Sequence, residues 1–379
     1  MNFNLTKTQE LFRQMIREFA DKEVKPLAAE VDEQERFPQE TVEKMAKLGL
    51  FGIPLEKEYG GAGGDNLMYT IAVEELSRAC ATTGVILSAH TSLCLSPIAQ
   101  FGTEEQKRKY LPKLASGEWL GAFGLTEPNA GTDASAQQTT AVLEDEEWVL
   151  NGSKIFITNG GKAHVYVIIA MTDKSLGNKG ISAFIVEAGT PGFEIGKKEL
   201  KMGIRGSATT ELIFTNCRIP KGNLLGKVGN GFAIAMKTLD GGRIGIAAQA
   251  LGIAQGAMDE TVKYTKERKQ FGKAIGKFQN TQFQMADLQT KVQAARLLVR
   301  SAAFKKDQGV PYSADAAMAK LFAAETAMEV TTKAVQFHGG YGYTREYPVE
   351  RMMRDAKITE IYEGTSEVQR MVIAANLYK

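Results

Sequence analysis

"IAAQALGIAQGAMDETVKYTKE", residues 246–267, has the pattern of a long helix. Its small and apolar residues recur three and four positions apart, which is the spacing of one face of an α-helix. Two more long stretches with this period follow, "TQFQMADLQTKVQAARLLVRSAAFKK" at 281–306 and "ADAAMAKLFAAETAMEVTTKAVQF" at 314–337. Because helices of such length suit a bundle, we expect the C-terminal part of the chain to be one.

The pattern changes toward the N-terminus. Between about residues 121 and 228 the apolar runs have strand length and are separated by Asn-Gly, Gly-Asn and Pro-Gly turn signals. From Thr6 to about residue 118 the helical spacing returns, with Gly and Pro at the breaks. The sequence therefore predicts three domains in the order α, β, α, with the ranges 1–120, 121–230 and 231–379. This order lacks the repeated strand-helix alternation of a doubly wound sheet or a TIM barrel.

Composition narrows the classes of protein. The chain has 379 residues, of which 44% are hydrophobic and 24% charged, a mixture typical of a folded globular protein. Lys plus Arg (46) nearly cancels Asp plus Glu (44), which gives no case for nucleic-acid binding. The first twenty residues predict an amphipathic helix rather than a signal segment, and apolar runs such as 165–171 are too short to span a bilayer. We expect a cytoplasmic protein without membrane insertion.

Several common sites are not indicated. Cys80, Cys94 and Cys217 are too few and too scattered for a disulfide framework, and the three histidines lack metal-ligand spacing, so no metal site is expected. The chain has no G-x-G-x-x-G opening a βαβ unit, no Walker A motif and no G-x-S-x-G elbow. A Rossmann dehydrogenase, a P-loop NTPase and an α/β-hydrolase are therefore disfavoured.

"DAKITEIYEGTSEVQR", residues 355–370, contains the most informative acidic residue. Ser366 and Gln369 have the spacing of a capping box and predict a helix start, which leaves Glu363 in the loop before the helix. Gly364 beside it can turn the backbone and allow another molecule to approach closely. Taken alone, such a glutamate is usually solvated.

Six segments in a fixed order change that interpretation: "AFGLTEPNAGTDAS", "WVLNGSKIFITN", "LDGGRIGIAAQALGIAQGA", "ERKQFGK", "AVQFHGGYGY" and "IYEGTSEVQ". Together they resemble the acyl-CoA dehydrogenase family, most closely its short-chain branch, over essentially the whole chain. The resemblance implies an α+β fold class: an N-terminal α-helical domain, a middle antiparallel β domain and a C-terminal four-helix-bundle domain. It also implies that FAD is the cofactor.

The family's cofactor positions can be carried over one by one. Those that match the flavin-ring site are Phe123, Leu125, Thr126, Gly131, Thr132, Phe156, Ile157 and Thr158. Those that match the nucleotide site are Arg268, Phe271, Gln279, Gln336, Phe337, His338, Gly339, Gly340, Thr365, Ser366 and Glu367. The resemblance implies that Arg268 and Gln279 reach the FAD of a neighbouring subunit. Many relatives have Trp at the Phe156 position, so the chain keeps an aromatic ring there.

The resemblance also implies the reaction. The positions for acyl-CoA contacts are Thr132, Asp240, Arg243, Tyr362 and Gly364. Glu363 would take a proton from the α carbon of the thioester while a hydride leaves the β carbon for the flavin. Its own backbone N–H, with a ribityl hydroxyl of FAD, would stabilise the thioester oxygen. The expected activity is the conversion of butyryl-CoA to crotonyl-CoA, or the reverse reduction, with electron-transferring flavoprotein as partner in a homotetramer.

Three alternative functions or sites are compatible with the same segments. In other branches the base directly precedes the arginine of the "GGR" segment, but that position is Gly242 here, so Glu363 is expected to be the base. An acyl-CoA oxidase would use related chemistry with oxygen as electron acceptor. A flavin-binding module without turnover is the third, and it is disfavoured by the intact Glu363 and the balanced charge. The sequence leaves open the preferred acyl-chain length, the direction of the reaction, any part in electron bifurcation and the flavin redox potential.

Overall fold

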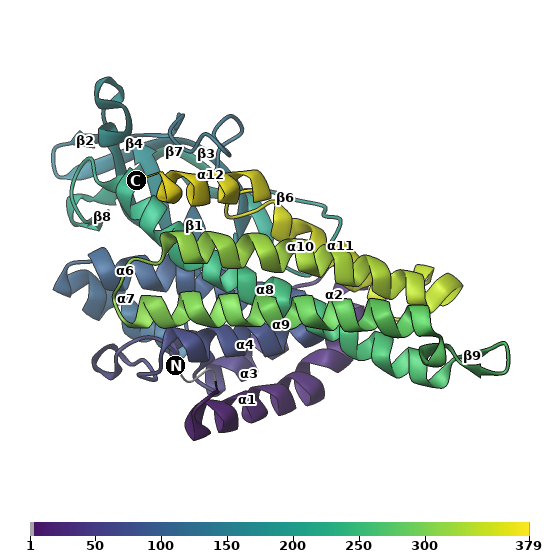
Figure 1. Cartoon of the computed structure of the whole chain (residues 1–379). Helices are drawn as coiled ribbons and strands as arrows, with labels where there is room; N and C mark the ends of the chain where they lie inside the picture. Colours follow the sequence, from purple (N-terminus) through teal and green to yellow (C-terminus); the bar gives the residue numbers. More distant parts are fainter. Residues whose placement is uncertain (1–3, 379) are drawn as a thin grey trace.

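The computed structural model describes residues 4–378 and divides into a helical N-terminal part, a sheet and a long-helix C-terminal part (Figure 1). This confirms the predicted fold class. The predicted ranges start at residue 1 and end at residue 379, and both of these ends lie outside the described residues. The internal boundaries near 120 and 230 stay predictions.

The N-terminal part consists of helices and short helical turns. Its first helix starts at a complete capping box, in which the Thr6 hydroxyl accepts from Gln9 N and the Gln9 side chain accepts from Thr6 N. The α-helices are α1 (Lys7–Phe19), α2 (Ala28–Glu33), α3 (Gln39–Lys47), α4 (Asn66–Ala79), α5 (Ala81–Ser88), α6 (Ser96–Phe101) and α7 (Glu104–Ser116). The π-helical turn η5 (Ala89–Leu95) joins α5 to α6.

The span Ala81–Phe101 is the one described helix that is long and apolar enough to cross a membrane. However, 72% of its apolar window is buried inside the protein, as in the central helix of a hydrophobic core. Burial against other elements accounts for its composition.

The middle part is one sheet of eight strands, with the order β6-β7-β3-β2-β4-β5-β8 and β1 beside β4. Most neighbours are antiparallel, whereas β1 and β2 both run parallel to β4. The strands are β1 (Gly121–Gly124), β2 (Thr140–Glu144), β3 (Glu147–Thr158), β4 (Val165–Met171), β5 (Ile181–Glu187), β6 (Phe193–Lys198), β7 (Thr209–Pro220) and β8 (Leu224–Leu225).

Strand β4 is apolar along its whole length because both of its faces are buried. Val165, Val167 and Ile169 belong to a core shared with N-terminal helices, whereas Tyr166 and Ile168 belong to the core on the other face of the sheet. Because alternate side chains of a strand point to opposite faces, burial on both faces requires a continuous apolar run.

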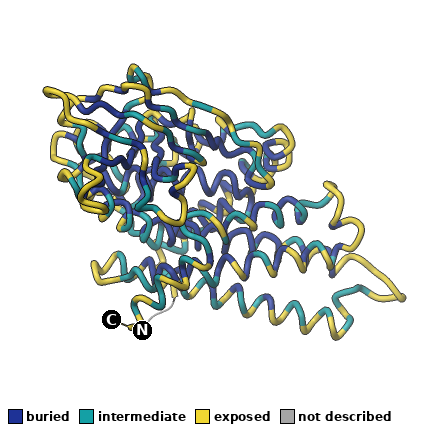
Figure 2. Tube along the Cα trace, turned by 90° about the horizontal axis from the view of Figure 1, so that it is seen from above, coloured by how far each residue is buried: buried dark blue, intermediate teal, exposed yellow. Residues whose placement is uncertain are grey.

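The C-terminal part is built on α8 (Gly231–Glu267), α9 (Gln279–Asp307) and α10 (Ser313–His338), which contain the three stretches predicted to be helical. The shorter α11 (Val349–Lys357) and α12 (Ser366–Leu377) pack against α10. The hairpin of β9 (Lys269–Gln270) and β10 (Lys273–Ala274) projects from the end of α8 (Figure 1). Figure 2 shows exposed chain at its tip and buried chain along the centres of the long helices.

Helix α8 lies at the centre of the helical parts and packs against α4, α9 and α10. Its glycines permit close contact with α4. A Cβ atom on Gly252 would lie 2.3 Å from the Glu74 carbonyl oxygen, and one on Gly256 would lie 2.4 Å from the Arg78 carbonyl oxygen. The N- and C-terminal helices consequently share one hydrophobic core.

Candidate active site

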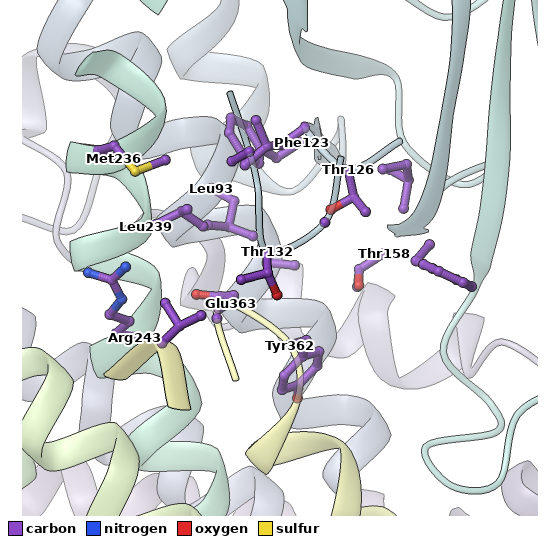
Figure 3. Close-up of a pocket in the computed structure, with 18 of the residues that line it drawn as sticks. Leu93, Phe123, Thr126, Thr132, Thr158, Met236, Leu239, Arg243, Tyr362 and Glu363 are labelled. Carbon is purple, nitrogen blue, oxygen red and sulfur yellow. The ribbon is translucent and has the colours of Figure 1, made fainter. Parts of the chain in front are cut away.

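A cavity of about 190 Å³ lies where the sheet, η5, α8 and the loop before α12 meet (Figure 3). Twelve predicted residues line it: Phe123, Leu125, Thr126, Gly131, Thr132, Phe156, Ile157, Thr158, Arg243, Tyr362, Glu363 and Gly364. Apolar side chains of Val85, Ala89, Leu93, Met236 and Leu239 complete much of its wall. The flavin-ring set and most of the substrate set therefore lie together.

Glu363 is the acidic group of this cavity. Its Oε2 atom is buried and has no hydrogen-bond partner among the described residues. Burial raises the pKa of the Glu363 carboxyl to about 7, against a smaller lowering effect of the positive charges of Lys320 and Arg243. A carboxyl with that pKa exchanges its proton readily near neutral pH, as a general base requires.

The backbone that carries Glu363 is strained. Glu363 has φ +52° and Gly364 has φ +92°, both in the left-handed region. A Cβ atom on Gly364 would lie 2.8 Å from Gln369 Nε2, so the turn also needs a residue without a side chain.

The predicted capping box before α12 is wrong. Thr365, not Ser366, is the N-cap, and its hydroxyl accepts from Val368 N at 3.3 Å. The Gln369 amide instead donates to the Glu363 carbonyl at 3.2 Å and the Gly364 carbonyl at 2.8 Å. The tight turn at 363–364 brings those carbonyls within reach, and they take the place of the expected N-cap partner.

Helix α8 forms the wall opposite Glu363. A Cβ atom on Gly242 would lie 1.9 Å from Glu363 Oε2, so the carboxylate occupies the space that this glycine leaves free. Arg243 forms an ion pair with Asp240, which also accepts from Ser313 Oγ at 2.9 Å. Asp240 is thus tied to the cavity through Arg243 but does not line it.

Tyr362 is fixed from the core side. Its hydroxyl donates to Gln249 Oε1, and the Gln249 amide donates to the Ala81 carbonyl at 3.1 Å. Burial raises the Tyr362 pKa well above its usual value, so the ring stays neutral.

The aromatic ring of Phe156 is presented by an irregularity in β3. The pairing of β3 with β7 shifts register between Lys154 and Ile157, and Phe156 has φ +59°. As a result its side chain is 60% exposed and borders the cavity instead of packing in the sheet.

A buried ion pair holds the loop that carries Thr126 and Thr132. Lys154 Nζ donates to Glu127 Oε1 at 2.6 Å and to Gln137 Oε1 at 2.5 Å. Glu127 also accepts from the backbone N–H groups of Gln138 and Thr139. The sequence analysis does not predict this pair, although Lys154 follows the inward-facing Leu150 by four positions and Trp148 by six in the same strand, which places a lysine on the core-facing side.

The residues predicted to bind the nucleotide do not all lie at this cavity. Thr365, Ser366 and Glu367 form the first turn of α12 beside it. A second cavity, of about 470 Å³, is lined instead by Arg268, Phe337, His338, Gly339 and Gly340, with Tyr264 from α8. Gln279 and Gln336 line neither cavity, and Phe271, at the tip of the hairpin, is 94% exposed.

The two cavities lie far apart along α8. Arg243 lines the first and Tyr264 the second, and these residues are 21 positions apart (264 − 243). At 1.5 Å per residue the separation is roughly 30 Å along the helix axis. One chain therefore presents the two predicted cofactor sets at separate places.

Within residues 4–378 no group of three His, Cys, Asp or Glu side chains is placed to hold a metal ion. The three cysteines are free and buried.

Comparison with known proteins gives consistent matches along the chain. Models of the N-terminal, middle and C-terminal domains of acyl-CoA dehydrogenases match residues 6–118, 122–217 and 229–378. A short-chain specific acyl-CoA dehydrogenase of Clostridium acetobutylicum is 66% identical over the full length of both chains. The solved butyryl-CoA dehydrogenase of Megasphaera elsdenii is 55% identical with a TM-score of 0.99, again over both whole chains. A chain in a structure concerning the electron transferring flavoprotein of Acidaminococcus fermentans is 60% identical, with the same TM-score of 0.99 and full coverage of both chains.

Proposed function

The chain belongs to the acyl-CoA dehydrogenase family and is an oxidoreductase of its short-chain type, and on that premise we propose that it interconverts butyryl-CoA and crotonyl-CoA with FAD as cofactor. The observation that carries the proposal is the Glu363 carboxyl, whose pKa burial raises to about 7 and whose Oε2 has no partner among the described residues.

The residues around the cavity fit a flavin. The exposed Phe156 ring and the apolar Phe123 and Leu125 offer surfaces for a planar ring system. Thr126 and Thr158 border the same space and bring hydroxyl groups suited to its polar edge (Figure 3). When bound, FAD supplies the acceptor for the hydride that leaves the β carbon of the substrate.

The chain's own groups supply the remainder of the reaction. We infer that Glu363 Oε2 accepts the α proton and that its carboxyl then holds it. The Glu363 N–H donates to the thioester oxygen as negative charge develops there, and one such donor contributes about 2.7–4 kcal/mol. The apolar wall of Leu93, Met236 and Leu239 excludes water, which keeps the pKa of the base high.

The short-chain relatives support a short substrate, since a short-chain specific acyl-CoA dehydrogenase and a butyryl-CoA dehydrogenase each match this chain over its full length. We therefore propose a preference for straight chains of four carbons, with six tolerated, because one methylene changes discrimination by only about 1–3 kcal/mol. A maximum of kcat/KM at eight carbons or more would refute the short-chain assignment, and isovaleryl-CoA should react more weakly.

We further propose that electron-transferring flavoprotein exchanges electrons with the bound FAD, that the enzyme is a homotetramer formed as a dimer of dimers, and that it works in the cytoplasm. The chain's similarity to one in a structure concerning an electron transferring flavoprotein supports the partner. The exposed Phe271 hairpin and the distance between the two cavities support assembly, since one chain alone does not bring the predicted nucleotide set together.

One experiment tests cofactor and reaction together. The purified protein should be yellow, and anaerobic addition of butyryl-CoA should bleach the flavin band. Reoxidation of the bleached enzyme by electron-transferring flavoprotein should be fast and by air slow. A colourless protein, or a yellow one that no acyl-CoA bleaches, would refute the proposal, whereas fast reoxidation by air would make it an oxidase.

A further inference from the structure

Lys320 is a buried lysine directly behind the proposed base. It lies on α10 in a stripe of buried alanines that includes Ala316 and Ala324, and its side chain is 0% exposed. Its Nζ donates to the Gly364 carbonyl at 2.8 Å, and no carboxylate within residues 4–378 forms an ion pair with it. Burying an ammonium group without a partner carboxylate is costly, so its presence here calls for a physical reason.

The Gly364 carbonyl belongs to the strained turn of the base. Gln369 Nε2 donates to the same carbonyl and also to the Glu363 carbonyl. Two buried side chains from different helices, α10 and α12, therefore hold two consecutive carbonyls whose residues both have positive φ. A strained turn persists only where its surroundings fix it in this way.

Lys320 is the first and Arg243 the second of the two cations that lower the pKa of Glu363. Arg243, on α8, also faces this region, but it forms an ion pair with Asp240. Glu360 is paired with Lys357 at 2.7 Å. Glu367 lies on the exposed side of α12. Burial lowers the Lys320 pKa to about 8, with Glu363 as the first of the charges that oppose this shift, so the ammonium form dominates at neutral pH.

We propose that Lys320 is a positioning residue for the base: its ammonium group fixes the 363–364 turn through the Gly364 carbonyl and supplies positive charge that favours the ionised form of the Glu363 carboxyl. The inference rests on the proposed function, because it assigns Lys320 a role toward the same reaction. Lys320 itself does not line the cavity.

The two parts of this role have different pH dependence. Loss of the charge raises the pKa of Glu363, so less of the base is ionised on the acid side of pH 7. Well above that pH Glu363 is ionised with or without Lys320, so any rate loss that persists there reports the loosened turn.

The variant Lys320→Met keeps the length of the side chain and removes both the charge and the donor. We expect the pKa of Glu363 in the FAD-loaded protein to rise by about one unit, which lowers the rate of flavin reduction by butyryl-CoA about tenfold on the acid side. Lys320→Arg should restore the pKa. Gln369→Leu removes the other donor without changing charge and should slow reduction at all pH values without moving the pKa.

The pKa is measured without turnover, by infrared titration of the protonated carboxyl band that Glu363→Gln deletes. The matched control is Lys333→Met, a lysine on the exposed side of the same helix. An unchanged carboxyl titration in Lys320→Met, or an equal shift in Lys333→Met, overturns the inference. If Lys320→Met does not fold, Lys320→Gln is titrated in its place under the same criterion.

This measurement separates the two proposals. If butyryl-CoA fails to reduce the wild-type flavin, the proposed function is wrong, yet the carboxyl titration still decides whether Lys320 sets the ionisation of Glu363. If reduction is normal and the titration does not move, only the inference about Lys320 is wrong.

Discussion

Glu363 combines a strained backbone, a buried oxygen and a pKa near neutrality, and each property can be tested with a single substitution. Glu363→Gln preserves size but cannot accept the α proton. We expect flavin reduction by butyryl-CoA to slow by about 10²–10⁴ in stopped-flow measurements. FAD content and the spectral change on ligand binding should be unaffected. A reduction rate within a few-fold of wild type would show that another group is the base.

The same substitution should stabilise the folded protein at alkaline pH. The pKa of Glu363 is about 7 when folded and 4.5 as the ordinary value, so the folded state binds the proton more tightly. Stability from this group is therefore lost as pH rises from 4.5 to 7, by at most about 3 kcal/mol. Urea unfolding should show Glu363→Gln more stable than wild type above pH 7 and equal to it below pH 4.5. A constant difference across that range would contradict the raised pKa.

Gly242 tests the space around the base. Because its Cβ would lie 1.9 Å from Glu363 Oε2 and 2.9 Å from Leu93 Cδ2, Gly242→Ala should displace the carboxylate and lower kcat. In the double variant Glu363→Gly, Gly242→Glu that space is free, and a carboxylate on α8 should recover part of the rate lost in Glu363→Gly. Gly222→Ala, at an open position with nothing within 4 Å and, like Gly242, without a positive φ, is the control for replacing a glycine without crowding. A Gly242→Ala enzyme as active as wild type would mean that Glu363 is free to move.

For single residues, the sequence predicts which residues line the site better than it predicts their hydrogen-bond partners. Glu363, Gly364 and Thr132 were expected from the resemblance, and they line one cavity. Thr365 as N-cap was not expected, because Ser366 has the same capping chemistry and only the turn geometry decides between them. Lys320 was not expected because its partner is a backbone carbonyl 44 positions away, which no local pattern reveals.

Among the elements, β3 and the loop after β1 are joined by the buried Lys154–Glu127 pair, whose exposed fractions are 0% and 4%. Lys154→Met leaves Glu127 as an uncompensated buried charge and should destabilise the protein by about 3–5 kcal/mol. The loop that carries Thr126 and Thr132 should then be looser, with faster loss of FAD on dilution.

Two controls define that result. Adding Glu127→Leu to Lys154→Met should recover much of the stability, because it removes the stranded charge. Lys221→Met breaks an exposed pair with Glu146 and should change stability by less than about 1 kcal/mol. Equal effects of Lys154→Met and Lys221→Met in thermal unfolding would show that burial of the first pair has no energetic consequence.

Helices were more predictable than strand neighbours. The helical pattern of residues 246–267 lies within α8, which begins at Gly231. This helix could be predicted because the residues that form one face of a helix are only three or four positions apart in the sequence. The parallel pairing of β1 with β4 was not predicted, since it joins Gly121 to Val165 and depends on the tertiary arrangement. The register shift that exposes Phe156 was missed for the same reason.

For the whole molecule, the proposed assembly can be tested at the second cavity. If Arg268 contacts FAD held by a neighbouring subunit, Arg268→Ala should weaken FAD retention while the tetramer persists. The variant Lys263→Ala, at an exposed position of α8 five residues before Arg268, should retain FAD normally. Light scattering measures the assembly state of each variant, and the flavin content measures its FAD retention. A monomeric protein with one FAD per chain would refute the cross-subunit assignment.

The number of residues in helix α8 fixes the distance and the relative rotation of the two cavities. The helix runs without interruption from the cavity of Glu363 to the cavity of Arg268. Deleting one residue between them would turn the far end by about 100° and draw it in by about 1.5 Å, so Tyr264 and Arg268 would face a new direction while every local sequence preference stayed intact. The spacing between the two cavities thus depends on the number of residues between them. Insertions or deletions in this stretch should be tolerated far less well than substitutions at its exposed positions.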